Sequence, residues 1–345
     1  RYWELARVLA RHGSVTLAAP EGSRLPAPID DSRSLVLAQY ERHDVEQMRQ
    51  LVQAADVIVA PGDSCVEFPF VLSSGKYLVM DGYDPHTFES LAWNQERPLE
   101  GRLDSHRQRL RILERQCAAG DLFVCASERQ RMLWLGWLEA AGRINPLTYD
   151  QDPTLRALVD TVPTGVPAEP PRHTGPLVRG VVPGIGQDDL LLVWGGGVWN
   201  WLDPLTLIAA VERVSVKHPH VRLYFPGSKH PYETFVPDMA MRQAAVDLCE
   251  DRGLNGKHVF WGDWVPYEER QNYLLEADIG CSMHFETIES HFSFRTRVLD
   301  YVWAGLPMIV TRGDAASEWV EEYKLGAVVD YRDAEGVAAA IDRLC

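Results

Sequence analysis

The residues best suited to chemistry lie in one stretch, His284–Asp314, where histidine, glutamate and arginine side chains precede a helical pattern. A helix is predicted over residues 296–303, ending at a Gly-Leu-Pro stop. Free backbone N–H groups and the helix dipole make such a start attractive to anions. Arg295 and Arg297 would add fork-shaped hydrogen bonds to a phosphate. Asp300, one turn further in, offers acceptors to sugar hydroxyls. The stretch therefore predicts a site for a phosphate-bearing sugar ligand.

The segment before this helix is expected to contribute further contacts. Glu286 and Glu289 lie three residues apart, flanked by His284 and His291. No spacing among them matches a known zinc pattern, so a catalytic or sugar-binding carboxylate is favoured over a metal site. The predicted catalytic residues of the segment are Glu286, Glu289 and His291. The predicted contacts at the helix start, besides the two arginines, are Ser293, Phe294 and Thr296.

A glycine-rich loop, W-G-G-G-V-W-N-W-L-D-P at residues 194–204, follows a short apolar segment. Consecutive glycines allow close backbone approach to a ligand, and Asp203 with Pro204 predicts the start of a helix. The loop matches neither a dinucleotide fingerprint nor a Walker loop. The alternative is a tight turn beside packed tryptophans. The predicted ligand contacts here are Gly195, Gly196, Gly197 and Trp199.

Two other segments follow predicted strands in the second half of the chain. In F-P-G-S-K-H-P, residues 225–231, Lys229 could meet a diphosphate as a point charge. In W-G-D-W-V-P-Y-E-E-R, residues 261–270, Trp264 and Val265 could bracket a flat base by stacking and main-chain hydrogen bonds. The alternatives are an inert surface lysine and a plain helix start.

The first half of the chain contains one comparable cluster. In V-M-D-G-Y-D-P-H-T-F-E, residues 79–89, Asp81 and Asp84 lie just past a predicted strand. Paired acids at a strand end can act as acid, base or hydroxyl binder. The alternative for Asp84 is an ordinary helix start before proline.

Composition excludes several classes of protein. The 345 residues carry a net charge of −15, which argues against nucleic acid as a partner. No run reaches the roughly 18 apolar residues that a membrane span needs. An arginine-rich stretch, 102–115, leaves peripheral membrane contact open, although such a stretch is usually a solvated helix face. Six scattered cysteines without a CxxC pair indicate reduced thiols in a cytoplasmic protein.

Strand-length and helix-period segments alternate in two series, as in parallel sheets covered on both faces. Strands are predicted at 15–19, 34–38, 56–60, 77–81, 121–126, 190–194, 221–225, 258–261, 279–283, 308–311 and 327–330. Helices are predicted near 44–54, 102–119, 127–142, 203–217, 237–253, 267–276, 296–304, 315–323 and 333–344. A proline-rich linker, 162–176, separates the series. We therefore predict two doubly wound domains, 1–165 and 166–345, with ligands at the carboxyl ends of the strands.

Residues 1–11 form an amphipathic helical pattern that no strand precedes. A domain of this class normally opens with a strand and a loop that feed such a helix. We therefore expect the first strand of the first domain to be missing from this sequence.

The second half resembles the donor domain of family 4 glycosyltransferases, which are retaining enzymes of the GT-B fold. L-D-Y-V-W-A-G-L-P-M-I-V-T, residues 299–311, is similar to the family's E-A-M-A-x-G-x-P-V-V-A-T, and 258–269, 276–282, 317–320 and 162–167 also resemble family segments. The resemblance covers most of residues 160–345 and is closest to a bacterial subgroup associated with surface polysaccharide assembly. It implies two Rossmann-like domains facing a central cleft.

The chain departs from the family pattern at two places. The family carries two glutamates eight residues apart; Asp300 occupies the second position, and the first falls on Phe292. The usual arginine and lysine of the glycine-rich loop are replaced, approximately, by Gly197 and Leu202. The resemblance therefore implies that Lys229, Arg295 and Arg297 meet the diphosphate and that Asp300 binds the ribose.

These observations predict metal-independent, retaining transfer from a nucleotide-diphosphate sugar, with no cofactor, to a carbohydrate or lipid-linked acceptor near Asp81 and Asp84. Donor residues would come from the second domain and acceptor residues from the first. The predicted location is the cytoplasm, with contact at the inner face of the membrane left open. The alternatives are a GT-B sugar-nucleotide epimerase and a degenerate, transferase-like binding subunit.

Overall fold

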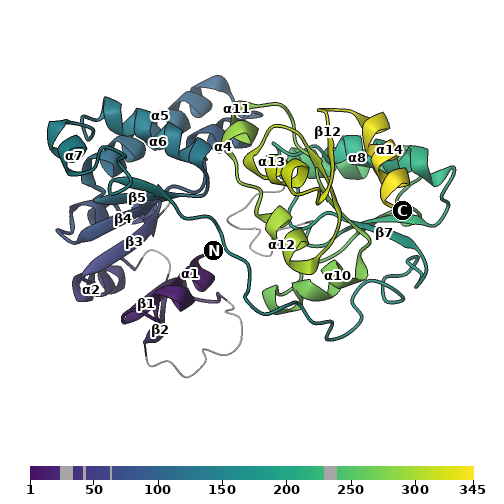
Figure 1. Ribbon diagram of the computed structural model, residues 1–345, viewed down its shortest axis with the longest axis horizontal. Coiled ribbons are helices and arrows are strands. Elements are labelled where there is room, and N and C mark those ends of the chain that lie inside the picture. Colours follow the sequence, from purple (N-terminus) through teal and green to yellow (C-terminus); the bar gives the residue numbers. More distant parts are fainter. Residues whose placement is uncertain (24–33, 42–43, 63, 229–238) are drawn as a thin grey trace. The chain divides into compact units, whose positions relative to one another are not determined.

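The computed structural model describes residues 1–23, 34–41, 44–62, 64–228 and 239–345. The chain divides into two compact units, Arg1–Gly165 and Val166–Cys345 (Figure 1). Each unit is built of parallel strands, most of them followed by helices. The predicted α/β fold with two Rossmann-like units is confirmed.

The first unit contains two parallel sheets. One has the order β3-β4-β5-β6, and within the described residues β1 and β2 pair only with each other. The strands are β1 (Val15–Pro20), β2 (Leu35–Tyr40), β3 (Val57–Pro61), β4 (Tyr77–Asp81), β5 (Leu122–Cys125) and β6 (Val159–Thr161). The helices are α1 (Tyr2–Leu9), α2 (Val45–Ala54), α3 (Ser64–Glu67), η1 (Pro69–Ser73), α4 (His86–Trp93), α5 (Leu99–Ala119), α6 (Glu128–Ala140) and α7 (Pro146–Gln151).

The second unit is one six-stranded parallel sheet of order β12-β11-β10-β7-β8-β9. Its strands are β7 (Leu190–Val193), β8 (Val221–Phe225), β9 (Val259–Trp261), β10 (Ile279–Ser282), β11 (Met308–Thr311) and β12 (Gly326–Val329). Its helices are α8 (Pro204–Ser215), α9 (Ala240–Asp251), η2 (Tyr267–Glu269), α10 (Arg270–Glu276), α11 (Ile288–Phe292), α12 (Thr296–Ala304), α13 (Ala315–Glu322) and α14 (Ala334–Leu344). The chain winds outward from β7 to β9 and returns to place β10 on the other side of β7. The loops after β7 and β10 therefore diverge at a topological switch point, the usual ligand position in such sheets.

Local chemistry sets the helix ends as predicted. Asp203 accepts a hydrogen bond from the Thr206 amide at 3.1 Å and precedes Pro204 at the first position of α8. Gly305 ends α12 in the left-handed conformation, with φ of 64°. In the part of the chain that the structure describes, no helix is both long and apolar enough to cross a membrane.

The carboxylate of Glu276 binds the segment 177–179, which follows the linker, to the end of α10. Glu276, at the end of α10, accepts hydrogen bonds from the amides of residues 177–179 at 2.7–2.8 Å. His173 Nε2 lies 2.8 Å from the same carboxylate. Burial alone would raise the pKa of Glu276, but these hydrogen bonds outweigh it and lower the pKa below its ordinary value.

Replacing Glu276 with Gln should lower the free energy of unfolding by about 2–3 kcal/mol at neutral pH, because a carboxylate that accepts several amides loses its charge. Since the folded-state pKa is depressed, the stabilisation is complete above the unfolded-state pKa and is lost as pH falls through the folded-state value. Urea unfolding of both proteins at neutral and acidic pH measures this. The difference should shrink at acidic pH, and the exposed Glu322→Gln variant is the control. Equal stability at neutral pH would contradict the assignment.

Candidate functional site

The glycine-rich loop and the start of α12 meet at the switch point of the second unit. Arg297 donates from Nη2 to the Gly197 carbonyl at 3.1 Å. Gly196 has φ of +88°, and a Cβ placed on it would lie 4.0 Å from the same Nη2. The guanidinium lies over the Trp194 ring, 4.8 Å from its centroid. Two segments a hundred residues apart in the sequence thus form one surface.

Arg297 is a cation that no carboxylate in the described part of the chain neutralises. Burial lowers its pKa to about 10, so it stays charged at neutral pH. Among the described residues no carboxylate pairs with it, and its buried Nη1 has no hydrogen-bond partner. It sits in the first turn of α12, where the dipole adds positive potential. This arrangement favours an anion beside the glycine-rich loop.

Tyr301, which was not predicted as a site residue, positions this loop. Its buried hydroxyl accepts a hydrogen bond from the Gly195 amide at 2.8 Å and lies 2.9 Å from the Cys281 carbonyl, to which it donates. A Cβ on Gly280 would lie only 2.6 Å from Tyr301 Cγ, so the ring requires glycine there. The hydroxyl therefore connects the ends of β7 and β10.

Replacing Tyr301 with Phe should lower the free energy of unfolding by about 1–3 kcal/mol, because the buried Gly195 amide loses the hydroxyl that accepts its hydrogen bond. Chemical denaturation monitored by tryptophan fluorescence measures the loss. Tyr323→Phe, at a residue 63% exposed, is the matched control and should be neutral. A neutral Tyr301→Phe variant would show that the hydroxyl does not hold the loop.

The predicted acidic segment contains a buried ion pair. Glu289, in α11, receives both terminal nitrogens of Arg295 at 2.9 and 2.7 Å. Ser293 donates its hydroxyl to the same carboxylate. The Arg295 and Glu289 side chains are only 8% and 2% exposed. Each residue therefore has a structural partner that the sequence did not indicate, and their predicted catalytic and phosphate-binding roles stay predictions.

The other residues of the segment differ in exposure. Glu286 and His291 are exposed, and the His291 ring contacts Phe292 edge-on at 4.9 Å. His284 is buried, and burial, together with the positive charge of Arg295, lowers its pKa to about 3. Its Nε2 lies 3.2 Å from the Arg312 carbonyl. At neutral pH His284 is therefore uncharged, and the exposed pair is the more accessible to a ligand.

Asp300, three residues after Arg297 in α12, is paired with Arg270. Arg270 Nε is 3.2 Å from Asp300 Oδ1, and the Asp300 side chain remains 34% exposed. Burial raises the pKa of Asp300, and the charge of Arg270 opposes that shift. Trp264 is 44% exposed, and a Cβ on Gly227 would lie 3.0 Å from its ring. The loops after β8 and β9 thus meet at Trp264.

The remaining predicted donor residues have mixed environments. Trp199 stacks on Trp201, with centroids 5.6 Å apart and planes 4° apart. Phe294 is buried against Trp319. Thr296 is exposed and Val265 half-buried. Lys229 lies outside the described residues.

In the first unit, Asp81 is buried in a bidentate pair with Arg1, at 2.7 and 2.8 Å. Asp84 is half-buried. The pKa of Tyr83 is raised, mainly by the burial of its own side chain and, to a smaller extent, by the charge of Asp84. Gln130 of α6 donates to the Tyr83 carbonyl at 2.5 Å. Asp81 and Asp84 thus lie on a loop that α6 holds at the carboxyl end of β4.

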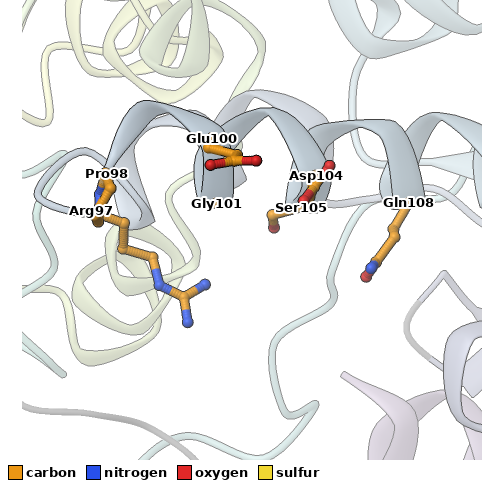
Figure 2. A pocket seen from close by; sticks show the side chains of 7 residues that line it. All are labelled: Arg97, Pro98, Glu100, Gly101, Asp104, Ser105 and Gln108. Carbon is orange, nitrogen blue, oxygen red and sulfur yellow. The ribbon is translucent and has the colours of Figure 1, made fainter.

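A shallow surface pocket of about 540 Å³ lies along the start of α5 (Figure 2). None of the predicted site residues lines it. Its lining residues are Arg97, Pro98, Glu100, Gly101, Asp104, Ser105 and Gln108. Within the described ranges, no three His, Cys, Asp or Glu side chains gather as a metal site would require.

Arg270, Tyr301 and Arg1 are the residues that sequence reasoning missed. Each acts through a partner at least 30 positions away, at Asp300, Gly195 and Asp81. The only sequence signal was indirect: an arginine and a tyrosine close to segments already predicted to bind ligand.

Comparison with known proteins finds one family model that matches within the second unit. Residues 189–345 match the family model described as glycosyl transferases group 1. No curated protein sequence matches the chain.

Solved structures similar to the chain include WaaG, a glycosyltransferase involved in lipopolysaccharide biosynthesis, with a TM-score of 0.64, 14% identity and coverage of 99% of this chain and 86% of that one. Sucrose-phosphate synthase from Thermosynechococcus elongatus has a TM-score of 0.62 at 15% identity, covering 99% and 82%. Anabaena HepE, in complex with UDP and glucose, has a TM-score of 0.56 at 13% identity, covering 90% and 76%. The chain therefore has the GT-B fold of these proteins.

Proposed function

We propose that this chain, whose residues 189–345 match a group 1 glycosyltransferase domain on the GT-B fold, is a retaining glycosyltransferase of family 4. It would move a sugar from a nucleotide-diphosphate sugar to an acceptor hydroxyl without a metal ion or another cofactor. The observation that carries the proposal is Arg297, a half-buried arginine against a three-glycine loop, whose buried Nη1 has no hydrogen-bond partner among the described residues. A diphosphate is the ligand chemistry that this arrangement suits best.

The donor is proposed to bind along the carboxyl ends of the second unit's strands. The diphosphate would contact Gly195–Gly197, Arg297 and the first amides of α12. Asp300 would bind the ribose, and Trp264 with Val265 would bracket the base. UDP in the similar HepE structure supports a nucleotide sugar as the donor class.

In the proposed reaction, the bond between the anomeric carbon and the diphosphate oxygen breaks. The acceptor oxygen bonds to that carbon on the same face, and its proton leaves with the diphosphate product. Negative charge grows on the leaving oxygens, where Arg297 and the α12 dipole stabilise it electrostatically. Because Glu289 is engaged by Arg295, orientation of the sugar is assigned to the exposed Glu286 and His291.

The acceptor is proposed to be a carbohydrate or lipid-linked sugar bound near Asp81 and Asp84. The reaction would take place in the cytoplasm and serve the assembly of a surface polysaccharide or glycoconjugate.

Peripheral contact with the inner face of the membrane would use α5. Leu99, Leu103 and Leu110 are 66%, 44% and 38% exposed and share one helix face beside the exposed Arg111. Sedimentation with anionic phospholipid vesicles tests this contact. The Leu99→Ser/Leu103→Ser variant should sediment less.

Calorimetric titration with UDP, GDP, ADP and CDP, followed by donor hydrolysis with the corresponding sugar nucleotides, tests the activity. Binding of one nucleoside diphosphate and slow release of a sugar that keeps its anomeric configuration are expected. A 2-epimerised sugar product would instead identify an epimerase. Failure of all four diphosphates to bind would refute the proposal.

A specific observation favours a second candidate, a degenerate transferase-like binding subunit. Phe292 occupies the position of the first glutamate in the family that the chain resembles, and the nearby Glu289 already forms a buried ion pair with Arg295. This candidate predicts tight diphosphate binding with no hydrolysis or transfer of any sugar nucleotide.

A further inference from the structure

Arg270 is held more rigidly than an arginine at the start of a short helix normally is. Its guanidinium carbon lies 3.7 Å from the centroid of the Tyr267 ring and 4.6 Å from that of the Trp303 ring. Its Nη1 donates to the Tyr267 carbonyl at 2.8 Å. The side chain is 11% exposed. Two aromatic contacts and a backbone acceptor therefore hold the planar group in place.

The structure around Arg270 is itself anchored. Trp303 donates from its indole nitrogen to the Glu169 carbonyl at 2.8 Å. Helices α10 and α12, which carry Arg270 and Asp300, lie side by side (Figure 1). The relative position of the two charged side chains is thus set by packing of the second unit, not by their mutual attraction alone.

The fixed guanidinium presents Nε to Asp300 Oδ1, at 3.2 Å. Within the part of the chain described, Arg270 is the only side chain bonded to this carboxylate, which is one-third exposed. A solvent-facing carboxylate normally samples several rotamers and loses this conformational entropy when a ligand binds. A carboxylate that is already held in one rotamer avoids the loss. Asp300 also has one methylene fewer than the glutamate usual at this position in the resembling family, so its reach is shorter.

We infer that Arg270 is a positioning residue that holds Asp300 ready for the two ribose hydroxyls, and that this pair makes the site selective for ribonucleotides over their deoxy forms. The inference rests on the proposed function. Arg270 does not itself touch the ligand; it acts by orienting an acceptor. A carboxylate that accepts both vicinal hydroxyls loses part of its hydrogen bonding when either is absent.

The test compares calorimetric dissociation constants for a nucleoside diphosphate and its 2′-deoxy and 3′-deoxy forms. UDP, GDP, ADP and CDP are titrated first, and the tightest is used. The wild type should prefer the ribose form by roughly tenfold or more. Arg270→Met should weaken the ribose form by about tenfold and each deoxy form, which keeps one hydroxyl, by clearly less. Arg252→Met, at a residue whose side chain is 57% exposed, is the matched control and should behave as wild type.

Asp300→Asn and the double variant decide whether Arg270 acts through Asp300. The double variant should bind no more weakly than Asp300→Asn alone. If Arg270→Met does not fold, Arg270→Lys replaces it: the ammonium keeps the charge but loses the planar contacts, so the same loss of selectivity is expected on a smaller scale.

Equal weakening of ribose and deoxy ligands by either Arg270 variant would overturn the inference, and so would a wild type without selectivity. Both results would leave the proposed function intact. Absence of diphosphate binding in the wild type would overturn the inference together with the proposed function.

Discussion

Replacing Arg297 with methionine should strongly weaken binding of nucleoside diphosphates and at the same time stabilise the ligand-free protein. The Nη1 of Arg297 is buried and unsatisfied, and burial lowers the pKa of the guanidinium to about 10, so the described part of the ligand-free fold does not neutralise this charge. Methionine keeps the apolar stem over Trp194 and removes the charge. A gain of about 1 kcal/mol or more in unfolding free energy is expected without ligand. Loss of the charged contact to a diphosphate should cost roughly 2–4 kcal/mol of binding, or about 30- to 1000-fold in affinity.

Thermal unfolding with and without a saturating nucleoside diphosphate measures both effects in one experiment. The variant should unfold at a higher temperature than wild type without ligand and should gain far less when ligand is added. Arg312→Met is the control, because its ion pair with Asp330 is at the surface and worth little. A variant that still gains ligand-induced stability equal to wild type would contradict the diphosphate role of Arg297.

The parts of the fold visible in sequence are those with a long enough local pattern. Every predicted strand occurs within two residues of its expected bounds, since each is an apolar run bordered by turn residues. The short elements β6, α4, α7 and α11 were not predicted, because three to eight residues carry too little periodicity. The sequence predicted the type of sheet, a parallel sheet with ligand loops at the carboxyl ends of its strands, but not the order of the strands within it.

The candidate site was predictable in location and not in the pairing of its charges. Residue type and helix position indicated that Arg297 and the glycine-rich loop face an anion, and the structure brings them within a hydrogen bond. Nothing local distinguishes Arg297 from Arg295, two positions earlier. Alternate residues at the start of a helix point in different directions, so Arg295 turns toward the buried Glu289 and Arg297 toward the loop. Only tertiary packing separates a structural arginine from one available to a ligand.

The buried ion pair of Arg295 and Glu289 yields a second large expected effect, on stability. Replacing Glu289 with methionine should lower the unfolding free energy by about 3–5 kcal/mol, because the buried Arg295 loses its two hydrogen bonds to Glu289, and Asp314, 4.0 Å from Arg295 Nε, is too far away to replace them. The reverse single variant, Arg295→Met, should cost a similar amount. The double variant removes both charges and should recover most of the loss, as a hydrophobic replacement of a buried ion pair commonly does. Chemical denaturation of the four proteins measures the cycle.

Comparing Glu286→Met with Glu289→Met shows which of the two glutamates is structural and which is catalytic. Glu286 is exposed and lies three residues before Glu289, so its loss should leave stability unchanged while donor hydrolysis falls, if it orients the sugar. If instead Glu289→Met keeps wild-type stability and loses activity, Glu289 is the acting carboxylate and the ion pair with Arg295 is not what holds this segment. The two glutamates differ in burial, so stability and activity measured together assign their roles, which their spacing in the sequence could not.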